Sequence, residues 1–258
     1  GFTVYFAGTY ALMRRLGRHA EPHALTAVGA PFVVLGFAFY FMRFAAFSAH
    51  PAVMFGLMVA AELLLLTVVL RELKFARAQL FLGMMVFALL AVWTGGHLTT
   101  QLLPWALGGF LGFAVLHTVL PLVLRRLRPD FTSPWWAQLA APLTLLLVLG
   151  TVCKFETVSW LVWPCVLLLD LIAIGLAFFT ASIGAVAAVL VLTLVAMGAW
   201  IFRIPVEITT PFALLGMLAA FALLFFGAGL FLVRRLGPKL AAVTAGSPFG
   251  TGLPGDPR

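Results

Sequence analysis

The sequence predicts an all-α protein, a polytopic transmembrane helix bundle. Of its 258 residues, 64% are hydrophobic and 9% are charged, and the mean hydropathy is +1.15. A soluble domain carries about a quarter charged residues. Apolar runs of roughly 20 residues follow one another along the chain, which is the length that a helix needs to cross the ~30 Å hydrocarbon layer of a bilayer. Both observations predict that lipid rather than water surrounds most of the chain.

The apolar runs divide into eight predicted full spans and one partial span. The first run, Gly1 to Met13, is too short to cross a bilayer, so we expect it to be the end of a helix that begins before Gly1. The stretch from Ser159 to Phe202 is too long for one crossing, and we expect a break between Thr180 and Gly184. The full spans are predicted at about residues 24–43, 52–70, 79–98, 103–124, 135–153, 159–180, 182–202 and 211–233.

The Lys and Arg residues test this division, because loops that stay in the cytoplasm carry an excess of them. If successive spans alternate in direction, 13 of the 16 basic residues fall on one side of the array and three on the other. The three are Arg43, Lys154 and Arg203. We therefore expect the majority side, and the C-terminus with it, to be cytoplasmic.

A repeat of four spans is the most informative feature of the sequence. The tripeptide Arg-Arg-Leu begins at Arg14, Arg125 and Arg234, at offsets of 111 and 109 residues. Glu62 and Asp170, two acidic residues within predicted spans, are 108 residues apart. Because four is an even number, both copies should have the same topology, as two parallel repeats. The predicted divisions are 1–18, the truncated last span of a preceding repeat; 22–129, repeat A; 133–238, repeat B; and 239–258, a disordered cytoplasmic tail rich in Gly and Pro.

Two segments carry a resemblance to a known family. They are HPAVMFGLMVAAELLLLTVVLRELK, which begins at His50, and SWLVWPCVLLLDLIAIGLAFF, which begins at Ser159. With its short basic loops and helices of the Leu-Asp-Leu type, the chain resembles the large polytopic membrane proteins of bacteria that are grouped as a domain of unknown function. The resemblance implies a bacterial inner-membrane location and a longer parent chain. It implies no activity, because that family supplies none.

Glu62 and Asp170 are the candidate intramembrane polar site. Each lies about ten residues into its span, near the expected midplane of the bilayer, where an ionised side chain costs at least ~2.5 kcal/mol. One hypothesis is that they form a pair that binds protons or a cation and faces the interior of the bundle. The alternative is that each is a hydrogen-bonded carboxyl group that holds neighbouring helices together, contributing ~1 kcal/mol.

Arg43 and Lys154 are the candidate contacts with lipid headgroups at the non-cytoplasmic interface, at equivalent places in the two predicted repeats. Half a membrane separates them from the acids, which is too far for an ion pair. We expect their side chains to extend to the outer interface, with an anionic lipid or substrate headgroup as the alternative.

The remaining polar residues give weaker signals. His97 and His117 have no counterparts in the second repeat, so both are interpreted as structural, hydrogen-bonded residues. Two scattered histidines do not make a metal site, and neither a metal nor another cofactor is predicted. Cys153 and Cys165 flank a short connection, and the sequence leaves open whether they are bridged.

The sequence leaves the function open between three classes. The first is a non-enzymatic role in transport, or in handling lipids or the cell envelope, through a cavity near Glu62 and Asp170. The second is a structural or assembly scaffold without transport or catalysis. An intramembrane transferase is disfavoured, because no catalytic motif is found and the acidic loop residues are separate. Membrane lipids are the expected partners, nucleic acid is not expected, and protein partners or a homo-oligomer remain undetermined.

Overall fold

In the computed structural model, the described residues are 2–16, 21–127, 138–156, 159–180, 184–202 and 211–245. Throughout these ranges the regular structure is helical, with no strand. The helices are α1 (Phe2–Arg15), α2 (Glu21–Phe41), α3 (Ala45–Ser48), α4 (Pro51–Val69), η1 (Leu73–Phe75), α5 (Ala76–His97), α6 (Leu103–Leu127), α7 (Ala140–Lys154), α8 (Val162–Thr180), α9 (Gly184–Ile201) and α10 (Pro211–Ala245).

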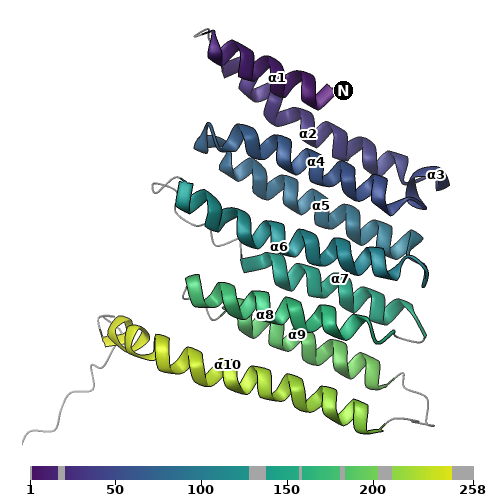
Figure 1. Ribbon diagram of the computed structural model, residues 1–258, viewed down its shortest axis with the longest axis vertical. Helices are drawn as coiled ribbons and strands as arrows, with labels where there is room; N and C mark the ends of the chain where they lie inside the picture. The colour runs from purple at the N-terminus through teal and green to yellow at the C-terminus, as the bar shows by residue number, and fades with distance from the viewer. Residues whose placement is uncertain are drawn as a thin grey trace, which may run out of the picture.

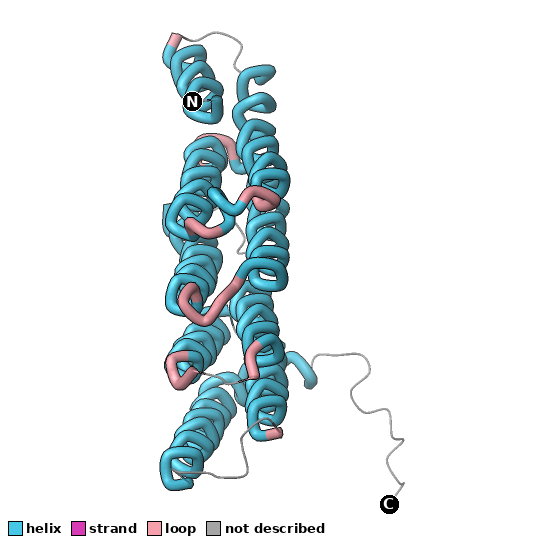
Figure 2. The backbone as a smooth tube through the Cα atoms, turned by 90° about the vertical axis from the view of Figure 1, so that its right-hand side faces the viewer, coloured by secondary structure: helices cyan, strands magenta, loops and turns pink. Residues whose placement is uncertain are grey.

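The long helices form two layers that extend in one direction (Figures 1 and 2). One layer holds α1, α4, α6, α8 and α10, and the other holds α2, α5, α7 and α9. Within a layer each helix packs beside the next one, and consecutive helices of the chain pack across the two layers. The result is an elongated array in which each helix contacts only near neighbours, rather than a bundle around one centre.

Five helical segments are long and apolar enough to cross a membrane by length and composition. They are His23–Phe41, Pro51–Val69, Leu73–His97, Leu103–Leu127 and Leu214–Phe231. Three shorter apolar helices, Ala140–Lys154, Val162–Leu176 and Val186–Ile201, complete the pattern within the described ranges. A helix therefore occupies every predicted place, while the exact number of spans and the repeat stay predictions.

The predicted break in the long apolar stretch agrees with the structure, since α8 ends at Thr180 and α9 begins at Gly184. The end of α10 differs from the prediction. The helix continues to Ala245, beyond the predicted end of its span at residue 233 and into the predicted disordered tail 239–258, and its last turns leave the direction of the rest (Figure 1). Proline inside a helix removes one hydrogen bond and bends the axis without always ending the helix. The remaining predicted tail, 246–258, lies outside the described residues.

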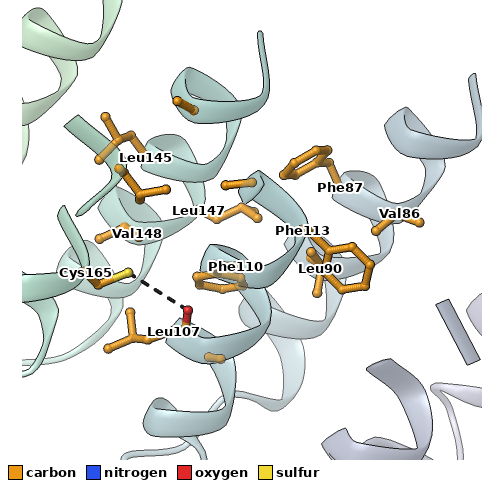
Figure 3. Close-up of a cluster of buried hydrophobic side chains, with 14 of the residues drawn as sticks. Val86, Phe87, Leu90, Leu107, Phe110, Phe113, Leu145, Leu147, Val148 and Cys165 are labelled. Carbon is orange, nitrogen blue, oxygen red and sulfur yellow. Dashed lines mark hydrogen bonds between the residues drawn. The ribbon is translucent and has the colours of Figure 1, made fainter. Parts of the chain in front are cut away.

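Apolar side chains fill the space between the layers and also cover the outside. Figure 3 shows part of the core, where Phe110, Leu147 and Val148 from α6 and α7 lie close together. Outward-facing residues include Phe212, which is 86% exposed, and within α10 only 6% of the segment Leu214–Phe231 is buried. A soluble monomer rarely exposes apolar surface of this extent, whereas lipid tails are a suitable solvent for it.

The basic residues mark one end of the helices. Arg14 and Arg15 end α1, Lys74 lies in the turn between α4 and α5, and Arg125 lies in the last turn of α6. All three places lie on the left-hand side of Figure 1. We call this side of the array the basic end. The other side, where α3 and the C-terminus of α5 lie, is called the opposite end.

Candidate functional site

Glu62 is the most buried acidic group of the first half of the chain. It lies just past the middle of α4 and is 1% exposed. The neighbouring residues of α4 are Leu, Val and Ala, and none of their side chains can form a hydrogen bond or an ion pair with a carboxylate. A buried carboxylate must therefore be satisfied by side chains from neighbouring helices.

The first partner of Glu62 is Gln79. Gln79 lies in the first turn of α5 and is 6% exposed, and its amide Nε2 donates a hydrogen bond to Oε2 of Glu62. Because α4 and α5 are antiparallel neighbours in different layers, this bond joins the layers. A neutral donor stabilises a carboxylate without neutralising it.

The second partner is His117, which lies near the middle of α6. Its ring nitrogen Nε2 is 3.2 Å from Oε1 of Glu62, which is close enough for an ion pair when the ring is protonated. The two atoms are not aligned as a hydrogen bond. A small rotation of the imidazole or the carboxylate would align them, so a proton could be shared between the two groups.

The backbone of α5 makes room for this imidazole at Gly83. An ideal Cβ atom at that position would lie 2.5 Å from Cε1 and 3.0 Å from Nδ1 of His117. Phe87, one turn further along α5, has its ring centroid 5.6 Å from that of His117. The imidazole is therefore held between a glycine and an aromatic ring, and a side chain at Gly83 would displace it.

A cavity of about 150 Å³ opens beside this cluster. Gln79, Gly83 and His117 line it, together with residues near the basic ends of α5, α6 and α7 such as Leu124 and Ala140. The volume is enough for a few water molecules. A separate groove of about 630 Å³ between α4 and α6 is apolar and is lined by none of the three cluster residues.

Three buried polar atoms of the cluster have no hydrogen-bond partner among the described residues: Glu62 Oε1, Gln79 Oε1 and His117 Nε2. Each such atom costs ~1–3 kcal/mol when it is left unsatisfied. Their convergence beside a cavity is the arrangement that a proton or a small polar ligand would satisfy. No group of three or more His, Cys, Asp or Glu suited to a metal occurs within the described ranges.

Asp170 has different surroundings. It lies in the middle of α8 with no exposed surface, and its Oδ1 accepts a hydrogen bond of 2.9 Å from the hydroxyl of Thr193 on α9. Its other oxygen, Oδ2, has no partner among the described residues. In its layer, α6 separates α8 from α4, so the two acids form two sites and not one pair.

The two candidate headgroup contacts also differ from each other. Arg43 follows α2 in an exposed position, with its guanidinium carbon 5.9 Å from the ring centroid of Tyr40. Lys154 ends α7, and its Nζ donates to the carbonyl oxygens of Thr94 and Gly95, at 2.8 and 2.9 Å. Those carbonyls belong to the last turn of α5, where helix acceptors lack partners within the helix.

A polar cluster at the basic end joins α1 to the turn between α4 and α5. The hydroxyl of Tyr10 donates to Oε1 of Glu72 at 2.5 Å, and Nη1 of Arg14 donates to that hydroxyl at 3.0 Å. Arg14 and Lys74 approach Glu72 within 3.6 and 3.4 Å. Glu72 is therefore not isolated, but these partly exposed ion pairs are of the kind that contributes little to stability.

Sequence reasoning missed Gln79 and interpreted His117 as structural. The available signal was that both are polar residues within otherwise apolar spans, and that Gly83 follows Gln79 by one helical turn. The cysteines, by contrast, are settled as unbridged: Cys153 is exposed and Cys165 is buried, with its sulfur 4.0 Å from the carbonyl oxygen of Leu107 (Figure 3).

Comparison with protein-family models, with curated proteins and with solved structures finds no match to this chain.

Proposed function

We propose that this chain is a multi-pass membrane protein with a proton-linked transport role, and that Glu62, Gln79 and His117 form its working site. The observation that carries the proposal is the 3.2 Å approach of His117 Nε2 to the buried Oε1 of Glu62, beside a cavity. A carboxyl group and an imidazole at this distance can pass one proton between them with no change in their total charge. The cavity supplies the space for exchange with a second donor or acceptor.

The proposed roles of the three side chains follow from their chemistry. Glu62 takes up and releases the proton, and His117 is the group that exchanges it with Glu62. Gln79 orients the carboxylate through its amide and stays neutral throughout. A second proton would leave the pair with a net positive charge in apolar surroundings, which is costly, so we expect one proton per cycle.

Asp170 is assigned a fastening role in this proposal. Its one hydrogen bond comes from a hydroxyl on the adjacent helix, and neither histidine nor amide reaches it in the described part of the chain. The inferred duplication would then have diverged, since Phe225 stands where the repeat offset would place a histidine. The proposed duplication has support in the arrangement of the helices. The first four long helices of the proposed repeats alternate between the two layers (α2, α4, α5 and α6), and the next four continue the same alternation (α7, α8, α9 and α10).

The proposed location is the bacterial inner membrane, with the basic end and the C-terminus in the cytoplasm. Its support is the excess of Lys and Arg at that end, as retained loops require, and the family resemblance of the spans. The cavity beside His117 opens among residues near the basic ends of their helices, so the proposed exchange of protons occurs from the cytoplasmic side.

The alternative function is a membrane scaffold. The observation that favours it is the set of polar contacts that tie helices in series, Asp170 to Thr193 and Lys154 to the end of α5. In a scaffold, Glu62 would likewise join neighbouring helices through its hydrogen bond and would bind no exchangeable proton.

Proton flux in reconstituted vesicles tests the proposed function. We expect the purified full chain to acidify vesicles under an imposed membrane potential, as measured with an enclosed pH-sensitive dye. Glu62→Gln should abolish the flux, because glutamine has the shape of glutamate but cannot release a proton. Asp170→Asn, the matched control, should leave it unchanged. A wild-type flux no faster than that of Glu62→Gln would favour the scaffold.

A further inference from the structure

A groove between α5 and α7 ends at the ammonium group of Lys154, and it is separate from the Glu62 cluster. Its volume is about 430 Å³, and it is lined by Ala91, Thr94, Gly95, Leu146, Leu147, Gly150, Cys153 and Lys154. Neither of the two glycines would place a Cβ atom within 4 Å of any other group, so the groove is open at both positions. Apart from Thr94, Cys153 and Lys154, its walls are formed by Ala, Leu and Gly.

The groove runs along the helices, from the opposite end toward the middle of the array. Leu146 and Lys154 are eight residues apart on α7, which corresponds to about 12 Å at the helical rise. The cation therefore lies at one end of an apolar channel that points into the hydrocarbon layer. This polarity matches an amphiphile with an anionic head and a hydrocarbon tail.

The charge of Lys154 remains available to such a ligand. The ammonium has three N–H groups, and the contacts with the carbonyl oxygens of Thr94 and Gly95 use two of them. The C-terminus of a helix carries about half a negative elementary charge, which compensates only part of the unit charge of the lysine. The side chain is also exposed, so the third N–H can reach a headgroup.

We propose that this groove binds one anionic phospholipid of the surrounding bilayer. An acyl chain lies along Leu146, Gly150 and Ala91, and the phosphate accepts a hydrogen bond from Lys154 Nζ. The two carbonyl contacts hold the ammonium at the mouth of the groove before the lipid arrives.

Native mass spectrometry of the purified full chain tests this proposal, with equal amounts of phosphatidylglycerol and phosphatidylcholine added. The wild type should retain phosphatidylglycerol in preference. Lys154→Gln should lower that preference about fivefold, whereas Lys154→Arg should keep it. Gly150→Leu fills the groove one helical turn before Lys154 on α7 and should remove the bound lipid of either kind. Arg126→Gln, which removes an exposed cation in the last turn of α6, outside the groove, should behave as wild type.

Two outcomes would overturn the proposal. One is unchanged retention of phosphatidylglycerol by both Lys154→Gln and Gly150→Leu. The other is an equal loss of preference in Arg126→Gln and Lys154→Gln, which would indicate a general attraction between positive charge and anionic lipid. Because Gly150→Leu leaves Lys154 and its two carbonyl contacts intact, the test remains decisive if Lys154→Gln folds poorly.

Discussion

Two acidic residues that look equivalent in the sequence have different partners in the fold. Glu62 lies between an amide and an imidazole beside a cavity, while Asp170 accepts one hydrogen bond from a threonine. A carboxyl group held by a hydroxyl in an apolar interior behaves as a fastener, whereas one beside an imidazole can exchange a proton. The difference at the residue scale is the basis for assigning the two acids different roles.

Thr193→Val tests the fastening role of Asp170. The substitution keeps the side-chain shape but removes the donor to Oδ1, which leaves both oxygens of a fully buried carboxyl group unsatisfied. We expect the free energy of unfolding to fall by about 1–2 kcal/mol, measured by denaturation in mild detergent. Thr67→Val is the control, because the Thr67 hydroxyl is exposed and bonds only to Leu64 of its own helix. Equal losses in the two variants would contradict a role for the Asp170 contact.

Glycines set how closely the helices approach, and they do so at particular positions. Gly83 on α5 faces the His117 ring, and Gly109 on α6 faces Phe55, where an ideal Cβ would lie 2.6 Å from Cε2 of that ring. Gly108 and Gly112, spaced four residues apart, line the same large apolar groove as Gly109, but a Cβ atom at either position would meet nothing within 4 Å. At the scale of the element, the spacing of glycines in the sequence therefore does not show whether a glycine lies against a side chain of a neighbouring helix or faces an open groove.

Gly83→Ala tests the close approach of α5 to α6. The added methyl group overlaps the imidazole, so we expect His117 to move away from Glu62 and stability to fall by about 1–3 kcal/mol. Thermal unfolding measures the loss, and the nitrogen chemical shifts of labelled His117 report the change at the ring. Gly56→Ala on α4, where a Cβ meets nothing within 4 Å, should be neutral or slightly stabilising. If both variants behave alike, the tight fit around His117 is wrong.

The sequence predicted the helices well because apolar length is a local property. Even the break between Thr180 and Gly184 follows from the fact that one helix cannot cross a bilayer with so many residues. The partners of Glu62 could not be predicted in the same way. Gln79 and His117 are 17 and 55 residues away along the chain, and only the packing of α4, α5 and α6 brings them together. The repeat offset suggested Asp170 as the partner of Glu62. Equivalent positions in two repeats need not be in contact, and these two acids are not.

At the scale of the whole molecule, successive long helices run in opposite directions (Figure 1), and we therefore propose that the basic loops lie on one side of the membrane. Labelling of single cysteines in oriented vesicles tests this, in a background where Cys153 and Cys165 are replaced by alanine. We expect an impermeant maleimide to label Arg71→Cys from the cytoplasmic side and His50→Cys from the other side. Labelling of both from one side would contradict the proposed topology, since α4 alone joins the two positions.

Infrared difference spectroscopy of the protein in lipid tests whether Glu62 exchanges a proton at the cluster. As the pH is varied from acidic to alkaline, we expect a reversible carboxyl band that is lost in Glu62→Gln and kept in Asp170→Asn. The band should shift in His117→Gln, because the imidazole contacts Oε1. A carboxyl band that stays constant over this whole range would contradict the account and leave a packed membrane scaffold in its place.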